Sequence, residues 1–292
     1  MAMHRKARAL AFVLVAGFFV VAMSLPVAGG VGGINGISSF TGGDGSFKRV
    51  VREGIVIGIA NDFPFTYQDE KTKEMDGLDV RIMRRVTKLL GIEKVSWQIV
   101  QFDAMIPGLV SKRWDVAADN IHENPKRLAV IDFTSPVYWY GSSLAVHKGN
   151  PKNIHTSADL AGKNVGVIRG SYYHDLLSKR HDFKELKIYT SNEAEFADLV
   201  AGRIDVAQED DIKVGLFIKN HPGVPIEFAS GYQPSLEEYG YARYGIRKDD
   251  IDLNHAISRA IDELRGQRDG IPQILVEGGL SLRNMWYWPV TQ

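Results

Sequence analysis

Side chains able to bind an anion are concentrated in the segment Ala118–Tyr140, ADNIHENPKRLAVIDFTSPVYWY. Asn120, His122, Asn124 and Arg127 follow an apolar stretch there. A guanidinium presents parallel N–H donors that match the two oxygens of a carboxylate, so Arg127 is a candidate anion-binding residue. The alternative is a polar surface turn, in which Arg127 forms an exposed salt bridge and His122 bonds to the backbone.

A near repeat of this segment supplies a second polar strand end. KRWDVAADN, Lys112–Asn120, resembles GRIDVAQED, Gly202–Asp210, and each copy follows an amphipathic helix. The repeat aligns Asn120 with Asp210. Because ligands of open parallel sheets bind outside the carboxyl ends of the strands, we expect these two side chains to face each other across a cleft between two similar lobes. The alternative for Asp210 is an N-cap of the helix that begins at Asp211.

Regular structure is expected from Phe47 onward, and it alternates between strands and helices. Apolar residues with helical spacing predict a helix over Leu78–Gly91, which the glycine ends. This alternation indicates the α/β fold class, with mostly parallel sheets in two similar lobes. The other predicted strands are residues 55–61, 96–102, 114–120, 164–170, 186–191 and 204–210, and the other predicted helices are residues 103–112, 172–180 and 193–202.

Composition argues against several classes of function. The chain has 292 residues, 45% hydrophobic and 24% charged, which indicates a globular protein. Its 35 basic and 35 acidic residues give no electrostatic reason to expect nucleic acid or an anionic membrane as a partner. Histidines are scattered and the sequence has no cysteine, so we expect no metal site, disulfide or cofactor. The sequence has no nucleophile elbow and no phosphate loop, so we expect no enzyme.

The N-terminal segment has the pattern of a secretory signal peptide. Residues 1–28 hold a basic head with Arg5, Lys6 and Arg8, then an apolar run, then small residues. An uncleaved membrane anchor is the alternative. Residues 29–46 are rich in glycine and serine and are expected to form a linker, since they lack the spacing of a nucleotide-binding glycine loop. We therefore expect export to the periplasm, as a freely diffusing protein.

Six motifs follow one another between about residues 50 and 279. Together they resemble the bacterial extracellular solute-binding proteins of the polar amino-acid uptake systems. The chain departs from that family at Asn124, where threonine is usual, and at Tyr172, where a small hydroxyl residue is usual. The motifs are DFPFTYQD, GLDVRIMRRVTKLLG, FDAMIPGL, NPKRLAVIDFTSPVY, DLAGKNVGVIRGS and AGRIDVAQED.

The resemblance implies the type II periplasmic-binding fold and a transport function. A first lobe would hold residues 47–141 and 246–292, a second lobe residues 142–245, and two strands near 141–146 and 241–246 would form the hinge. The protein would be a monomer that closes on an amino acid or a related small zwitterion and delivers it to an inner-membrane ABC permease.

Two other functions are compatible with the same fold. The main alternative is an exported cyclohexadienyl dehydratase acting on prephenate or arogenate, for which His122 is the best candidate for the required general acid. A sensory domain is the other, but the sequence after the second lobe offers no transmembrane or signalling segment.

The resemblance also assigns roles to residues that would hold the charged ends of the ligand. Arg127 matches the arginine that pairs with the ligand's α-carboxylate, and Asp210 matches the aspartate that receives its α-ammonium. Ser171 matches a position that assists carboxylate binding at the start of a helix. Tyr172, as a departure from the family, is expected to narrow or reshape the pocket.

The remaining candidates would surround the rest of the ligand. Asn120 and His122 stand where the family has small or hydroxyl residues, and both are expected to point into the cleft. Phe102 matches an aromatic or apolar position that packs on the ligand side chain. Phe63 would form the opposing wall unless it belongs to the core, and Asp62, from the first-loop motif, completes the predicted set.

Overall fold

The computed structural model describes residues 43–285, which belong to one compact unit, residues 33–292. The predicted signal peptide, residues 1–28, and most of the predicted linker lie outside the described residues. Within residues 43–285, no helix combines the length and the apolar character that crossing a membrane requires.

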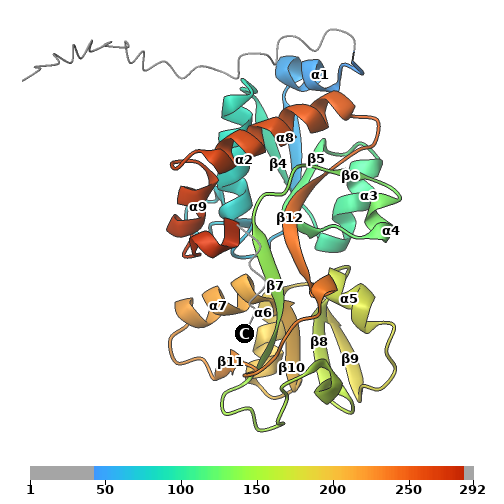
Figure 1. The fold of residues 1–292 in the computed structure, drawn as a ribbon, viewed down its shortest axis with the longest axis vertical. Coiled ribbons are helices and arrows are strands. Elements are labelled where there is room, and N and C mark those ends of the chain that lie inside the picture. The colour runs from blue at the N-terminus through green and yellow to red at the C-terminus, as the bar shows by residue number, and fades with distance from the viewer. Residues whose placement is uncertain (1–42, 286–292) are drawn as a thin grey trace, which may run out of the picture. The chain divides into compact units, whose positions relative to one another are not determined.

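The first lobe is built on three parallel strands (Figure 1). β1 (Ile55–Ile59) lies between β4 (Val95–Ile99) and β5 (Val116–His122). Every residue of β5 is buried, as expected for a strand that is covered on both faces. The lobe's helices include α1 (Ser46–Glu53), α2 (Leu78–Leu89), α3 (Met105–Val110), α4 (Pro125–Leu128), α8 (Ile251–Gly266) and α9 (Ile271–Glu277), of which α8 and α9 pack against α2.

The second lobe repeats this arrangement. β8 (Asn164–Ile168) lies between β9 (Glu185–Tyr189) and β10 (Val206–Asp210), again in parallel. Most of its apolar side chains form clusters of their own, whereas Ile212 and Leu216 pack into the large cluster around α2 and α8. Its helices are α5 (Tyr172–Leu177), α6 (Asn192–Val200) and α7 (Asp211–Asn220).

Two long antiparallel strands join the lobes (Figure 1). β7 (Trp139–His147) pairs with β10, whereas β12 (Tyr239–Ile246) pairs with β5, and the two strands pair with each other. The predicted fold class, two α/β lobes joined by two strands, is confirmed. The smaller elements are β2 (Tyr67–Gln68), β3 (Met75–Asp76), β6 (Asp132–Phe133), β11 (Ile226–Phe228) and the 3₁₀ turns η2 (Phe102–Ala104), η3 (Ser157–Leu160), η4 (Leu236–Glu238) and η5 (Leu282–Met285).

The internal sequence repeat has a physical counterpart in two equivalent hydrogen bonds. In the first lobe, Asp115 Oδ2 accepts from the backbone N of Val56 at 3.0 Å. In the second lobe, Asp205 Oδ2 accepts from the backbone N of Asn164 at 2.8 Å. Each aspartate thus satisfies a backbone donor at the start of the neighbouring parallel strand, which explains why both copies carry it.

Local structure differs from the prediction at two places near the cleft. The predicted helix 103–112 begins as the turn η2 and continues as α3 only to Val110, since Lys112 has a left-handed φ of 62°. The predicted polar turn contains the one-turn helix α4. Asn124 Oδ1 accepts from the backbone N of Arg127 at 2.8 Å, and Pro125 follows the cap, so a local N-cap forms this helix.

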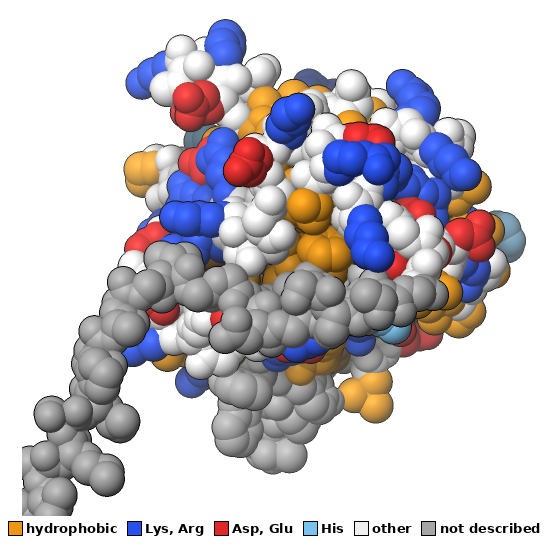
Figure 2. Space-filling model, turned by 90° about the horizontal axis from the view of Figure 1, so that it is seen from above, with side chains coloured by type: hydrophobic (Ala, Val, Ile, Leu, Met, Phe, Trp, Pro, Cys, Tyr) orange, Lys and Arg blue, Asp and Glu red, His pale blue; other side chains and the backbone are white. Residues whose placement is uncertain are grey.

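The surface over one end of the molecule carries both signs of charge. Figure 2 shows Lys and Arg side chains interspersed with Asp and Glu, with apolar side chains between them. This mixture agrees with the balanced composition of the whole chain, 35 basic against 35 acidic residues.

Candidate functional site

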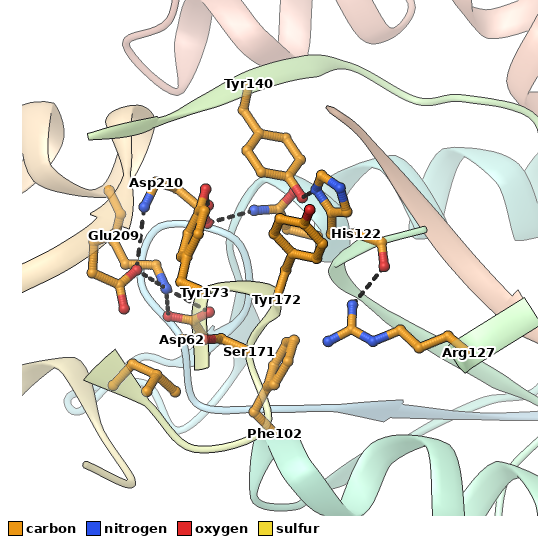
Figure 3. Close-up of a pocket in the computed structure, with 13 residues that line it drawn as sticks. Asp62, Phe102, His122, Arg127, Tyr140, Ser171, Tyr172, Tyr173, Glu209 and Asp210 are labelled. Atoms are coloured by element: carbon orange, nitrogen blue, oxygen red, sulfur yellow. Dashed lines mark hydrogen bonds and ion pairs between the residues drawn. The ribbon is translucent and has the colours of Figure 1, made fainter. Parts of the chain in front are cut away.

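A cavity lies where the carboxyl ends of β5 and β10 approach each other, and both lobes contribute to its lining (Figure 3). Its volume is about 30 Å³, room for roughly two water molecules. An amino acid therefore enters only when side chains or lobes move apart. The lining residues are Asp62, Phe102, Asn120, His122, Arg127, Tyr140, Ile168, Ser171, Tyr172, Tyr173, Glu209, Asp210 and Lys213.

Arg127 is a buried cation whose guanidinium donates hydrogen bonds to uncharged oxygens. It is 6% exposed, and its guanidinium donates to the carbonyl oxygens of His122 at 2.5 Å and of Gly170 at 2.9 Å. No carboxylate of residues 43–285 forms an ion pair with it. Burial lowers the pKa of Arg127. The exposed salt bridge that was the alternative for this residue is not formed.

Phe102 and Ser171 lie beside this guanidinium. The ring centroid of Phe102 is 5.8 Å from the Arg127 guanidinium carbon, a cation–π contact. Ser171 is the N-cap of α5, and its Oγ accepts from the backbone N of His174 at 3.0 Å. Ser171, Tyr172 and Tyr173, at the start of α5, all line the cavity.

Asp210 and Asn120 meet as the repeat predicts. Asn120 Nδ2 donates to Asp210 Oδ2 at 2.8 Å, and Tyr173 Oη donates to Asp210 Oδ1 at 2.8 Å. Asp210 makes no side-chain cap bond to α7, so its alternative role as a cap is not supported. Burial, opposed by the charge of Lys213, raises the pKa of Asp210 to about 8.

The backbone conformation of Asn120 sets the direction of its side chain. This residue has a left-handed φ of 42°, a conformation that asparagine tolerates better than most residues. Its backbone N donates to Asp79 Oδ2 at 2.8 Å. Asp79 is fully buried and also accepts from the hydroxyls of Tyr138 at 3.1 Å and Tyr244 at 2.9 Å.

His122 belongs to an aromatic group on one wall of the cavity. Its ring stacks on Tyr172 with centroids 4.1 Å apart, and its Nδ1 lies 3.0 Å from Tyr140 Oη. Burial, with a smaller effect of Arg127, lowers the pKa of His122 to about 4. The imidazole is therefore neutral at pH 7, which does not suit the proton donor that a dehydratase requires.

Asp62 enters the cavity from the loop after β1 and meets a lysine of the other lobe. Lys213 Nζ lies 3.1 Å from Asp62 Oδ1 and 3.0 Å from Glu209 Oε2. Lys213 is 5% exposed, and burial raises the pKa of Asp62 to about 6 despite this pairing. The ion pair between Lys213 and Asp62 connects the two lobes, at the opposite end of the cavity from Arg127 (Figure 3).

Phe63 does not line this cavity with the other predicted residues. It packs against the core cluster and lies 5.4 Å from the ring of Tyr67. It also borders a separate apolar hollow with Phe196 and Phe217. Phe63 lies in the tight turn between Asp62 and Thr66, in which Asp62 O accepts from the backbone N of Phe65 at 2.9 Å and of Thr66 at 3.0 Å. The chain reverses direction there, so Phe63 leaves the side of the cavity on which Asp62 lies.

Several lining residues were not predicted from the sequence. Tyr140, Ile168, Tyr173, Glu209 and Lys213 all reach the cavity. The sequence carried a signal for one pair. Glu209 and Lys213 have opposite charges and lie four residues apart, one near the end of β10 and the other in the first turn of α7. Within residues 43–285 no cluster of three or more His, Cys, Asp or Glu side chains has the arrangement of a metal site. Chemically, the cavity offers a buried cation at one end and carboxylates at the other.

Comparison with protein families gives one match that covers most of the chain. The model of bacterial extracellular solute-binding proteins, family 3, matches residues 55–270. The L-cystine-binding protein TcyJ of Escherichia coli K12 is 31% identical over 237 residues, covering 80% of this chain and 85% of that protein. The lysine/arginine/ornithine-binding periplasmic protein of the same strain is 30% identical, covering 79% and 88%.

Solved structures share the fold. A variant of ArgBP from T. maritima superimposes with a TM-score of 0.73 at 23% identity, covering 80% of this chain and 99% of that one. An ancestral amino acid-binding protein, AncCDT-1, described as a precursor of cyclohexadienyl dehydratase, gives a TM-score of 0.71 at 20% identity, covering 80% and 98%. At these identities the likeness concerns the fold alone.

Proposed function

The chain belongs to the bacterial extracellular solute-binding proteins of family 3, and from that premise we propose that it captures an amino acid or a related small zwitterion in the cavity between its lobes. The observation that carries this proposal is Arg127. A buried guanidinium without an ion-pair partner in the described chain is costly unless an anion reaches it. A ligand α-carboxylate would supply that anion with two parallel hydrogen bonds.

The opposite charge of the ligand would be received by Asp210. Its carboxylate faces Asn120 and Tyr173, which are neutral donors, so a ligand ammonium would be its first cationic hydrogen-bond partner in the cavity. Arg127 belongs to the first lobe and Asp210 to the second. A zwitterion that bridges them binds the closed form better than the open form, which is what ligand-driven closure requires.

The similarity of this chain to periplasmic binding proteins extends the proposal to a role in transport. Relatives that match most of this chain are named as amino-acid-binding periplasmic proteins. We therefore place this protein in the periplasm as a monomer that delivers its ligand to an inner-membrane ABC permease. The moving parts would be residues 47–141 with 246–292 and residues 142–245. Each has apolar clusters of its own, and Ile212 and Leu216 of the second part pack against the cluster of the first.

A ligand panel tests this function. Mature protein that has been unfolded and refolded to remove carried-over ligand should gain several degrees in Tm with at least one amino acid. Arg127→Ala should abolish that gain while the circular dichroism spectrum stays unchanged. Arg113→Ala, an exposed arginine away from the cavity, should keep the gain and serves as the matched control.

Two results would contradict the proposal. One is the absence of a response to every amino acid, opine and related zwitterion in the panel. The other is turnover of prephenate or arogenate by the purified protein, which would favour the dehydratase alternative on this fold. Because His122 is neutral at pH 7, such turnover would also require a different general acid.

A further inference from the structure

Lys213 occupies an unusual position for a lysine, because its ammonium is enclosed between the lobes. It lies in the first turn of α7, and its side chain is 6% exposed. Its Nζ contacts Asp62 at 3.1 Å and Glu209 at 3.0 Å, and it lies 5.7 Å from the ring centroid of Phe65. A partly buried carboxylate of the first lobe, Asp62, and a buried carboxylate of the second, Glu209, therefore share one buried ammonium.

The ammonium balances the charge of that end of the cavity. Burial alone disfavours the charged lysine, but the carboxylates of Asp62, Glu209 and Asp210 outweigh burial, so the pKa of Lys213 lies well above its ordinary value. Lys213 thus stays cationic. Its ion pairs engage Asp62 and Glu209, whereas Asp210 is bonded to neutral donors and remains open to a ligand cation.

The lining residues divide according to the parts of an amino-acid ligand. Arg127 and Ser171 would face its carboxylate, and Asp210 would face its ammonium. The lining that remains for the ligand side chain consists mainly of the aromatic wall of His122, Tyr140 and Tyr172, the apolar Phe102 and Ile168, and the ionic group of Asp62, Glu209 and Lys213. A ligand side chain that extends away from Arg127, toward the opposite end of the cavity, would end beside Lys213.

We propose that Lys213 is a specificity-determining residue, which admits ligands whose side chain carries no net positive charge and rejects lysine-like and arginine-like ligands. The inference rests on the proposed function. A cationic side chain would meet the ammonium of Lys213 in a water-poor cavity, where like charges repel strongly. It would also find Asp62 and Glu209 already paired.

A neutral polar side chain meets a better-matched environment. Asn120 Oδ1 belongs to a residue that lines the cavity, is buried and has no hydrogen-bond partner in the described residues. An amide or hydroxyl of the ligand would donate to that oxygen without disturbing the ion pairs. Specificity would then combine one attractive contact with one repulsive charge, as selective binding sites commonly do.

Titration calorimetry with wild-type protein is the first test, using L-glutamine, L-cystine, L-lysine and L-arginine as probes. The best net-neutral ligand should bind at least roughly tenfold more tightly than either cationic ligand, a difference of about one decade in Kd. A wild-type protein that binds lysine or arginine most tightly would overturn the inference while supporting the proposed function. A wild-type protein that binds no zwitterion would overturn the proposed function itself.

Variants of the lysine separate charge from packing. Lys213→Met retains the length of the side chain but leaves Asp62 and Glu209 without their cation, so affinity for lysine and arginine should rise relative to the neutral ligand by on the order of tenfold. Lys213→Arg should keep the wild-type preference. Lys219→Met, on the exposed part of α7, should change nothing.

A double variant decides between charge balance and a general loosening of the cavity. Asp62→Asn combined with Lys213→Met removes one charge of each sign and should lose part of the gain for cationic ligands. An equal loss of affinity for all four probes in Lys213→Met would contradict the inference. An unaltered preference of Lys213→Met for the neutral ligand over lysine and arginine would also contradict the inference.

Discussion

At the scale of single residues, the proposed role of Asp210 would make both stability and ligand binding depend on pH. Burial raises its pKa to about 8 from an ordinary value of 3.8. The folded chain therefore holds a proton on Asp210 across this interval while the unfolded chain does not. By linkage, the contribution of Asp210 makes the free energy of unfolding fall as pH rises from about 4 to about 8.

Ligand affinity should change with pH in the opposite sense. A ligand ammonium requires the carboxylate form of Asp210, so Kd should fall as pH rises from 6 toward about 8, by up to roughly tenfold per pH unit. Asp210→Asn should bind more weakly and lose this slope. Titration calorimetry in buffers of different ionisation enthalpy should detect release of a proton by the wild type only; a flat wild-type profile would refute the role of Asp210.

At the scale of elements, the short helix α4 fixes the direction of Arg127. Asn124 caps this helix by accepting from the backbone N of Arg127 itself at 2.8 Å. The side chain of Arg127 then spans to the second lobe, where it donates to the carbonyl of Gly170. One helical turn, held by one amide, therefore sets the position of the proposed carboxylate anchor.

Removing that cap should affect both stability and binding. Asn124→Ala should cost about 1 kcal/mol of unfolding free energy, the usual value for a lost N-cap, and should weaken ligand binding by a further factor of several. Asn124→Ser, which retains a capping oxygen, should keep most of the unfolding free energy and most of the ligand affinity. Denaturant titration and calorimetry measure the two effects, and full ligand affinity in Asn124→Ala would show that α4 does not need its cap to hold Arg127.

The elements near the cleft show where sequence reasoning succeeds and where it stops. Alternating periodicity predicted the parallel strands, and the repeat predicted that Asn120 meets Asp210. The contact between Lys213 and Asp62 was not predicted, because it depends on which face of α7 turns toward the other lobe. Apolar periodicity marks a buried face but does not distinguish burial in a core from burial against a partner lobe. Phe63 was misplaced for a similar reason, since its motif did not fix the direction of each loop side chain.

At the scale of the whole molecule, the lobes approach each other closely at Gly170. This glycine has a φ of 75°, and a Cβ atom built on it would lie 2.8 Å from Asp103 Cβ and 3.0 Å from Asp103 Cα. Real Cβ atoms do not approach backbone so closely. The absence of a side chain at Gly170 therefore permits the closed arrangement.

Gly170→Ala should hold the lobes apart. We expect ligand affinity to fall by at least roughly tenfold, with a larger radius of gyration in the presence of ligand by small-angle X-ray scattering. Gly162→Ala is the matched control, since Gly162 has a similar φ of 69° but no neighbouring atom within 4 Å of the added Cβ. It should bear the same backbone strain and keep the affinity. Equal losses in the two variants would assign the effect to strain rather than to closure.

The buried carboxylate of Asp79 lies where the two joining strands meet the first lobe. It receives the hydroxyl of Tyr138, just before β7, the hydroxyl of Tyr244 in β12, and the backbone N of Asn120. One buried side chain therefore connects Tyr138, Tyr244 and the backbone of Asn120, which lines the cavity, by hydrogen bonds. We expect the first lobe and the adjoining parts of the two strands to move as one rigid body that includes Asn120. Asp210 would move with the second lobe. A ligand that binds Asn120 would therefore be coupled, through Asp79, to both joining strands.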